Sequence, residues 1–244
     1  MKFSALIADK PSDFYRIKNL AIAKKRWQEK MPDVELVIVT NNDEPFNKAK
    51  AFNQAAKQAT GDYFILADAD IMFGTKLIDR MATFAQEHDW IIPWRTCYEL
   101  SKEYSARFYD NETFVLPKMI TVEDLYPQTV VIRNHSITNQ YVNLYETDGA
   151  YINVISREAF EEIKGLDERF IGWGCEDLAL AAALNTLVGQ PYRMNERIFH
   201  LYHDRKTGVA NPRYKANEEL WFRYKEALGD VTKMRSIIDE REAR

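Results

Sequence analysis

The residues with the clearest chemical potential are two carboxylates that follow an apolar run. Residues 63–67 are aromatic and aliphatic and come after the turn signal Thr60-Gly61-Asp62, so they predict a short buried strand. Asp68 and Asp70 follow at once, and residues i and i+2 of an extended segment project to the same side. Two like charges placed in this way repel unless a cation lies near them. The spacing therefore indicates a divalent-cation site, and the alternative is a solvated acidic turn.

A second cluster is the segment Gly172-Trp173-Gly174-Cys175-Glu176-Asp177. Glycines on both sides of a tryptophan allow a tight turn that leaves the indole open to a ligand, and indole faces stack well on sugar rings. Glu176 and Asp177 open a predicted helix, whose dipole favours the ionised carboxylate that a general base needs. The alternative is that the two acids only cap this helix.

Two histidines and two lysines complete the candidate chemistry. His200 and His203 end a strand-like segment, and imidazole combined with carboxylate and phosphate oxygens suits manganese or a similar divalent ion. Lys48 and Lys50 open another predicted helix, where cations and backbone N–H groups can bind a diphosphate. The alternatives are structural histidines and a solvated helix face.

The elements that must position these residues alternate along the chain. Strands are predicted over 3–8, 34–40 and 63–67, with helices over 13–30 and 47–59 between them. This order predicts an α/β fold with a parallel, doubly wound sheet, in which ligands bind at the carboxyl ends of the strands. Further strands are predicted at 90–94, 149–155 and 197–202, and further helices at 76–87, 157–164, 177–188, 214–228 and 230–243.

Composition narrows the class of protein. The 244 residues, 46% of them hydrophobic, suit one large domain with a full core. A net charge of −4 argues against a non-specific nucleic-acid binder. The two cysteines have no metal-ligand spacing, and no segment has the length of a secretory signal or a membrane span. We therefore expect a cytoplasmic protein that contacts a membrane, if at all, as a peripheral protein at its inner face.

Together the motifs resemble the GT-A class of nucleotide-sugar glycosyltransferases, and most closely the β-1,4-galactosyltransferase and the galactosyl- and N-acetylgalactosaminyltransferase families. The matching segments are 46–53, 68–71, 156–160, 165–167, 172–177, His200 and 211–213. The resemblance implies a Rossmann-like nucleotide-sugar-binding domain over 1–213, with a mixed, mainly parallel sheet flanked by helices. Residues 97–146 would form an acceptor-side insertion, and 214–244 a C-terminal helical extension.

The resemblance also implies an activity, which is transfer of a hexose (galactose, N-acetylgalactosamine or glucose) from a UDP-sugar to a hydroxyl group, with inversion. Asp177 would be the base, and Mn²⁺ or Mg²⁺ the cofactor. The implied donor-binding residues are Lys48, Lys50, Asn53, Asp68, Ala69 and Asp70. The implied acceptor- or sugar-binding residues are Asp148, Gly149, Trp173, Gly174 and Glu176. The implied metal ligands are Asp70, His200 and Asp68, with His203 as the alternative histidine.

Two departures from the family pattern affect the donor site. Cys175 replaces a glycine, and Glu146-Thr147-Asp148-Gly149 replaces an aromatic-Gly-Gly segment that shapes the donor-sugar pocket. The family's transmembrane stem is absent as well, which favours a bacterial or viral cytoplasmic enzyme. The acceptor stays open among a glycan, a lipid-linked saccharide, a protein and modified DNA. The competing functions are a nucleotidyltransferase or phosphotransferase that uses Asp-x-Asp, and a non-catalytic module that binds nucleotide sugars or glycans.

Overall fold

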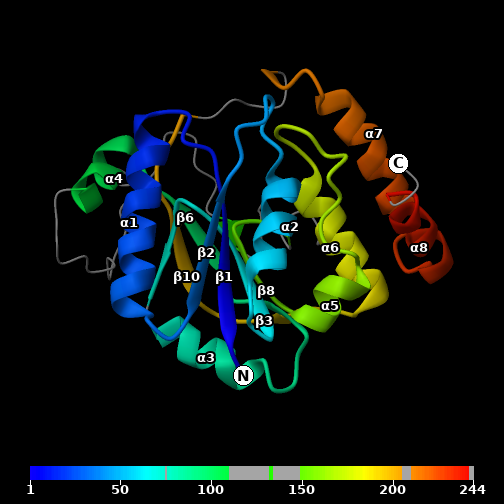
Figure 1. Cartoon of the computed structure of the whole chain (residues 1–244), viewed down its shortest axis with the longest axis horizontal. Coiled ribbons are helices and arrows are strands. Elements are labelled where there is room, and N and C mark those ends of the chain that lie inside the picture. The colour runs from blue at the N-terminus through cyan, green and yellow to red at the C-terminus, as the bar shows by residue number, and fades with distance from the viewer. Residues whose placement is uncertain (75, 110–131, 134–148, 205–209, 242–244) are drawn as a thin grey trace.

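A computed structural model describes residues 1–74, 76–109, 132–133, 149–204 and 210–241, and a six-stranded sheet lies at its centre (Figure 1). Its strand order is β2-β1-β3-β8-β5-β9. The strands are β1 (Phe3–Asp9), β2 (Glu35–Thr40), β3 (Tyr63–Asp68), β5 (Trp90–Ile92), β8 (Ile152–Ser156) and β9 (Tyr192–Arg193). β1 pairs in parallel with β2 and β3, whereas β8 runs antiparallel to β3 and β5. The predicted mixed, mainly parallel α/β sheet is confirmed.

A second sheet has the order β4-β10-β6-β7. It consists of β4 (Ile71–Phe73), β6 (Thr96–Glu99), β7 (Ile132–Arg133) and β10 (Arg197–His200). β4 begins immediately after Asp70 and pairs antiparallel with β10, so that His200 is in register with Ile71. The backbone N–H of Leu201 also donates to the carbonyl of Asp70 at 2.9 Å. This pairing brings the late histidines beside the early carboxylates.

Helices cover both sheets. They are α1 (Phe14–Lys30), α2 (Lys48–Gln58), α3 (Lys76–Phe84), α4 (Lys102–Tyr109), α5 (Arg157–Glu162), α6 (Glu176–Leu187), α7 (Tyr214–Glu226) and α8 (Val231–Asp239). The side chains of Asp13, Asn47 and Ser156 cap α1, α2 and α5, which satisfies backbone N–H groups that a helix start leaves without partners. In the described residues, no helix combines the length and apolar character needed to cross a membrane.

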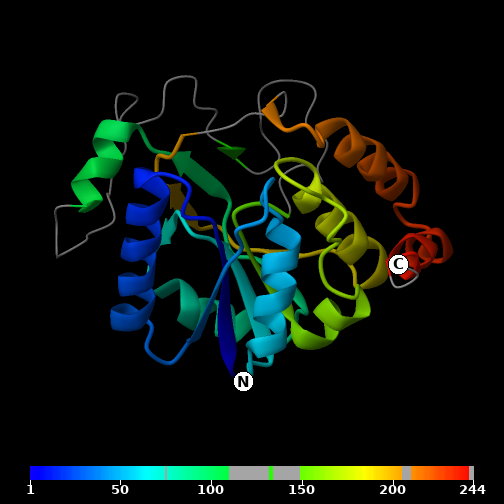
Figure 2. The same cartoon turned by 45° about the horizontal axis from the view of Figure 1, so that its top comes forward.

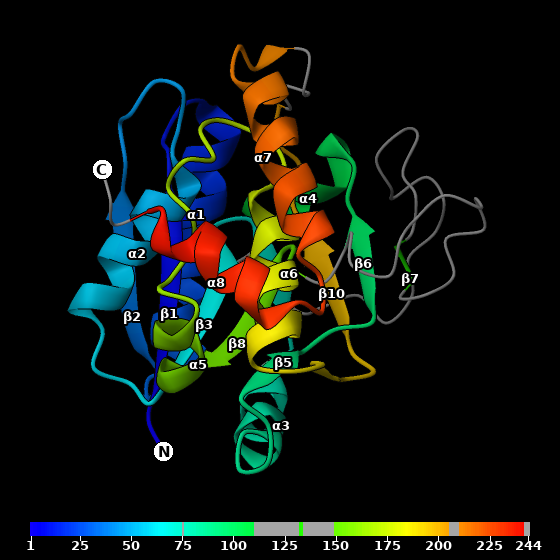
Figure 3. The same cartoon turned by 90° about the vertical axis from the view of Figure 1, so that its right-hand side faces the viewer.

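The Ala- and Leu-rich helix α6 is buried because other elements cover it on several sides. Its residues 179–184 are all buried, and α7 and α8 pack against it (Figure 3). A helix that is apolar on most of its surface is stable in water only when it is covered in this way. The two terminal helices therefore hold α6, which begins with Glu176 and Asp177, against the sheet.

The segment 97–146 is only partly described. Its first residues belong to β6, which pairs with β10 in the second sheet, and α4 follows. Residues 132–133 form β7, and 110–131 and 134–148 lie outside the described residues. Several predicted helices end earlier than expected, since α3 ends at Phe84, α5 at Glu162 and α8 at Asp239.

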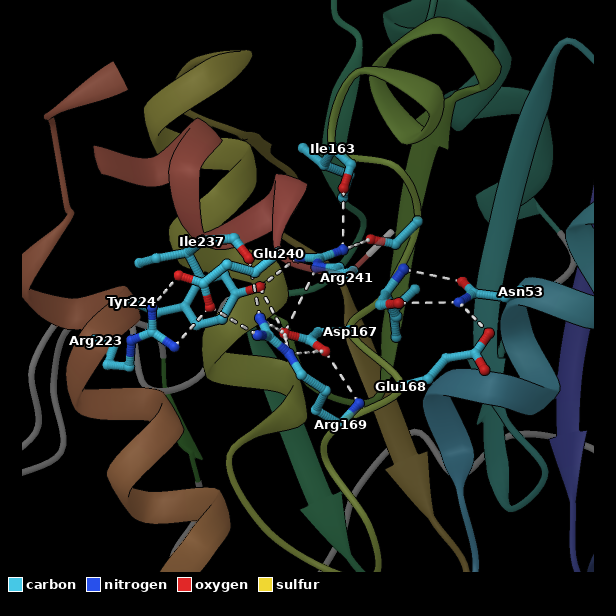
Figure 4. Close-up of polar contacts among 12 residues, drawn as sticks. Asn53, Ile163, Asp167, Glu168, Arg169, Arg223, Tyr224, Ile237, Glu240 and Arg241 are labelled. Atoms are coloured by element: carbon cyan, nitrogen blue, oxygen red, sulfur yellow. Dashed lines mark hydrogen bonds and ion pairs between the residues drawn. The ribbon is translucent and has the colours of Figure 1, made fainter. Parts of the chain in front are cut away.

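A buried carboxylate fixes the loop that leads to the glycine-tryptophan turn (Figure 4). Both oxygens of Asp167 accept hydrogen bonds from the Arg169 guanidinium, at 2.7 to 3.0 Å, and one accepts from the Tyr224 hydroxyl at 2.9 Å. Arg241 Nε lies 3.5 Å away. Burial would raise the pKa of Asp167, but Arg169 and Arg241 outweigh it and lower the pKa below its usual value. The loop is therefore fastened to α7 and to the end of α8 by a buried ion network.

We predict that Asp167→Asn destabilises the fold by about 3 kcal/mol, because it leaves buried guanidinium groups without their anion. A carboxylate whose pKa is lowered on folding stabilises the folded state fully at pH values above its unfolded-state pKa of about 3.9. This stabilisation is lost as the pH falls through the folded-state pKa. The difference in free energy of unfolding between wild type and variant, measured by urea denaturation, should therefore be constant near neutral pH and shrink below about pH 4. Asp239→Asn, which removes an exposed partner of Lys164, is the matched control and should cost less than about 1 kcal/mol.

Candidate active site

Three buried side chains form a group that can hold a metal ion. The ligand atoms of Asp70, His200 and His203 all lie within 4.8 Å of one another. His200 Nε2 is 3.3 Å from one oxygen of Asp70, and His203 Nε2 is 3.3 Å from the other. The pairing of β4 with β10 produces this arrangement, because Asp70 precedes β4 and His200 ends β10. The structure brings both candidate histidines to the same carboxylate.

The chemistry of this group fits a divalent cation. Asp70 Oδ1 is buried and accepts no hydrogen bond of good geometry from the described residues, although it lies 3.3 Å from His200 Nε2. Burial opposes the charge of Asp70, but His200 and His203 lower its pKa well below the usual range. Burial lowers the pKa of His203, which favours the neutral imidazole that metals bind. One carboxylate and two imidazoles are typical ligands of Mn²⁺ and similar ions.

A second cluster surrounds Lys48. Its ammonium nitrogen lies 2.9 Å from Asp68, 3.2 Å from Asp177 and 3.7 Å from Glu176. Burial opposes the charge of Lys48, but the three carboxylates outweigh it and hold its pKa well above the usual value. Burial raises the pKa of Asp177 to about 8, with Glu176 and Asp68 adding to the rise and Lys48 opposing it. The expectation that the helix dipole favours an ionised Asp177 is therefore wrong, because burial and the neighbouring acids outweigh the dipole and raise the pKa.

The expectation that Asp68 and Asp70 project together is wrong. β3 ends at Asp68, and the chain turns at Ala69 and Asp70, so the period of two ends there. Asp68 is directed to Lys48, and Asp70 is directed to the histidines. The two carboxylates lie in neighbouring clusters, and the metal-binding group found among the described residues does not include Asp68.

The glycine-tryptophan turn is held open by backbone geometry. Gly172, Gly174 and Cys175 all have positive φ, of 73°, 121° and 72°. Cys175 is a non-glycine residue in the left-handed region, so this turn keeps its shape at a cost in strain. The Trp173 side chain is exposed, and its ring stacks on Tyr214 with centroids 5.9 Å apart. The indole is therefore available to a ligand.

Asparagine side chains fasten this turn to the start of α7. Asn211 donates to the carbonyls of Ile171 and Trp173, and Asn217 donates to those of Ile171 and Gly174. A Cβ at Gly172 would overlap the Asn211 side chain, and one at Gly149 would overlap the backbone of Asp177. Gly149 thus packs directly on the first turn of α6, whereas Asp148 lies outside the described residues.

Two predicted donor-binding residues lie away from both clusters. Lys50 pairs with Asp43 at 2.9 Å. The Asn53 carboxamide bonds the backbone of Leu166 and the carboxylate of Glu168. Asn53 also lines a cavity of about 870 Å³ that contains none of the metal-binding or Lys48 cluster residues. The structure thus gives these two side chains partners of their own.

Two residues at the site carry no recognisable sequence signal. Tyr151, with φ of 61°, lies 5.6 Å ring to ring from His200 and donates to Glu99. It also lines a small cavity with Lys48, Asp68 and Asp177, so it joins the two clusters. Arg16, in the first turn of α1, lies 3.1 Å from Nδ1 of His203. Only the tertiary structure places an arginine from residue 16 beside a histidine from residue 203.

Solved structures of other proteins have a fold similar to that of this chain. The structure of S. aureus TarS 1–349 in complex with UDP superimposes with a TM-score of 0.55 at 12% identity, covering 99% of this chain and 71% of the other. A GalNAc-T7 structure with UDP, GalNAc and Mn²⁺ gives 0.53 at 13% identity, covering 99% and 55%. At such identities the likeness shows the fold, which is GT-A. Comparison with curated protein sequences gives no match.

Sequence profiles identify the family. The profile of the N-terminal domain of galactosyltransferase matches residues 136–204, which contain the glycine-tryptophan turn and both histidines. The profile of glycosyl transferase family 2 matches residues 20–163, more than half of the chain, and includes Lys48, Asp68 and Asp70. With the fold and the two clusters in agreement, the chain belongs to glycosyl transferase family 2.

Proposed function

We propose that this enzyme transfers a hexose from a UDP-sugar to a hydroxyl group, with Asp70, His200 and His203 holding Mn²⁺ and Asp177 acting as the base. The observation that carries the proposal is the adjacency of the two clusters, which share the Asp68–Asp70 segment and Tyr151. One cluster can neutralise a diphosphate through a metal, and the other can accept a proton. The UDP and Mn²⁺ bound to the GalNAc-T7 relative, and the UDP bound to TarS, support this assignment.

The proposed roles follow from the surroundings of each side chain. A bound divalent ion supplies a Lewis acid that stabilises negative charge on the departing diphosphate. Lys48, which stays protonated, lies between Asp68 and Asp177 and holds both carboxylates in place. Asp177 accepts the proton of the acceptor hydroxyl as that oxygen attacks the anomeric carbon opposite the diphosphate, which inverts configuration. Glu176 binds acceptor hydroxyls, and Trp173 stacks on the acceptor sugar.

The donor sugar is proposed as galactose, N-acetylgalactosamine or glucose. A panel of UDP-sugars, incubated with Mn²⁺ and followed by UDP release with and without hydroxyl acceptors, selects among them. Acceptor-dependent release of UDP supports transfer of the sugar. Release of sugar 1-phosphate in place of UDP would show transfer of the nucleotidyl group and contradict the proposal.

For the metal site, we predict that Asp70→Asn weakens Mn²⁺ binding at least about tenfold, because the carboxylate is the anionic ligand of the three. Isothermal titration calorimetry of the purified protein measures this directly. Asp68→Asn is the matched control two residues away and should retain Mn²⁺ affinity, since Asp68 is paired with Lys48. Equal losses in the two variants would show that Asp68 also binds the metal.

For the base, we predict that Asp177→Asn lowers the rate of transfer by about 10²- to 10⁴-fold while the enzyme still binds donor. The asparagine keeps the size of the side chain but cannot accept a proton. Glu176→Gln is the neighbouring control and should raise KM for the acceptor more than it lowers kcat. A transfer rate for Asp177→Asn close to that of wild type would exclude Asp177 as the base.

The raised pKa of Asp177 predicts a pH dependence. A base acts when deprotonated, so kcat/KM for the acceptor should rise with pH and level off above about 8. The measurement uses saturating Mn²⁺ and donor, which separates titration of Asp177 from that of the metal ligands. A profile that is flat from about pH 6 to about pH 9 would contradict the role of Asp177.

A further inference from the structure

The outward face of α1 combines exposed apolar and basic side chains in one stripe. Phe14 is 62% exposed and Ile17 is 52% exposed, which places them among the six large apolar residues in the described chain that are exposed. Lys18, Ala21, Lys24 and Lys25 continue the stripe at the three- and four-residue spacing of a helix face, and all are exposed. Side chains on the opposite face, such as Trp27, are buried.

The charge of α1 contrasts with that of the protein. The helix contains six Lys and Arg residues and a single acid, Glu29, in a chain whose net charge is −4. Arg16 and Arg26 are directed inward, to His203 and to the carbonyl of Phe73. Lys25 has a weak ion pair with Glu29 at 3.9 Å, and in the described residues no carboxylate pairs with Lys18 or Lys24. The stripe therefore has a positive charge that no carboxylate in the described part of the chain neutralises at Lys18 or Lys24.

The neighbouring helix α4 widens this surface. It contacts α1, and the ammonium group of Lys102 lies 5.3 Å above the ring of Tyr15. Arg107 stacks on Tyr104 with its guanidinium carbon 4.7 Å from the ring centre. Cations beside aromatic rings extend the same combination of charge and apolar area beyond α1.

The apolar end of the stripe lies near the carboxyl ends of the parallel strands, where the candidate active site is found. β1 ends at Asp9, and α1 begins five residues later at the same edge (Figures 1 and 2). Arg16, between Phe14 and Ile17, reaches the metal-binding group through His203. A surface that received Phe14 and Ile17 would therefore lie close to the metal-binding edge.

We propose that the outward face of α1 is a docking surface for a membrane that contains anionic lipids. A helix with apolar side chains and lysines on one exposed face lies in the lipid–water interface, where the apolar groups enter the acyl boundary and the ammonium groups bind lipid phosphates. Charge complementarity favours this occupant, because a second copy would bring an equally positive stripe to the contact. Ile17 distinguishes it from a nucleic-acid surface, because an aliphatic side chain, unlike an aromatic ring, does not stack on bases.

This orientation has a consequence for the acceptor, which rests on the proposed function. A docked enzyme would present its metal-binding group to the bilayer. A lipid-linked saccharide is held at that membrane surface by its lipid. Of the four acceptor classes that the sequence leaves open, this favours the lipid-linked saccharide. Docking itself is independent of catalysis and is tested without any transfer reaction.

The test is vesicle co-sedimentation of the full chain with phosphatidylcholine vesicles, with and without phosphatidylglycerol. One variant, Phe14→Ser/Ile17→Ser, removes the apolar part, and another, Lys18→Glu/Lys24→Glu/Lys25→Glu, reverses the charge. Matched controls change the same residue types elsewhere: Phe222→Ser on α7, which removes a side chain that is 50% exposed, and Lys57→Glu/Lys215→Glu/Lys225→Glu. Circular dichroism and UDP release with a soluble acceptor verify that each variant is folded and active.

We expect binding to vesicles with phosphatidylglycerol that decreases with added salt and is negligible with phosphatidylcholine alone. The lysine variant should bind at least about tenfold more weakly, since each lysine near an anionic surface contributes about fivefold. The Phe14/Ile17 variant should also bind more weakly, and both controls should bind as wild type does. The proposal would be overturned if the α1 lysine variant and the Lys57/Lys215/Lys225 control lost vesicle binding equally, or if the wild type did not bind. A dimer in solution that Phe14→Ser/Ile17→Ser dissociates, or lysine-dependent retention on nucleic acid without vesicle binding, would also overturn it.

Discussion

Carboxylates close together in a protein interior require cations, and the arrangement of this enzyme follows from how that requirement is met. Asp68, Asp70, Glu176 and Asp177 converge at one edge of the central sheet. Lys48 neutralises part of this charge on one side. On the other side, Asp70 lies between two imidazoles, and the ligand atoms of the three side chains lie within 4.8 Å of one another, a grouping that can hold a metal ion. The site therefore holds more carboxylates than Lys48 alone can neutralise.

The strands and helices around the site position these clustered side chains. β3 ends with Asp68, and the turn after it holds Asp70. The pairing of β4 with β10 brings His200 beside Asp70, and α2 begins with Lys48. α6 delivers the other two acids, and it can be buried only because α7 and α8 cover it. Asn211, Asn217 and the Asp167 network fasten the connecting loop to these terminal helices. The terminal helices thus stabilise the site although they supply none of the clustered charges.

The sequence predicted the local features well. The strand before Asp68, the helices predicted over 13–30 and 47–59, and the helix that opens with Glu176 all follow from short-range patterns in the sequence. Helix ends were less accurate, since α5 and α8 end before their predicted limits. End positions depend on tertiary contacts, which short-range patterns do not contain.

The motifs by themselves determined which residue types would take part: the two aspartates, the glycine-tryptophan-acid turn and the late histidines. Only the tertiary structure decided how they are grouped. Because the chain turns at Ala69, Asp68 pairs with Lys48, whereas Asp70 contacts His200 and His203. Lys50 and Asn53 bind other partners. Arg16 and Tyr151 enter the site without any motif. The physical reason is that side-chain direction at the end of a strand, and contacts between residues far apart in the chain, are set by packing and by strand register.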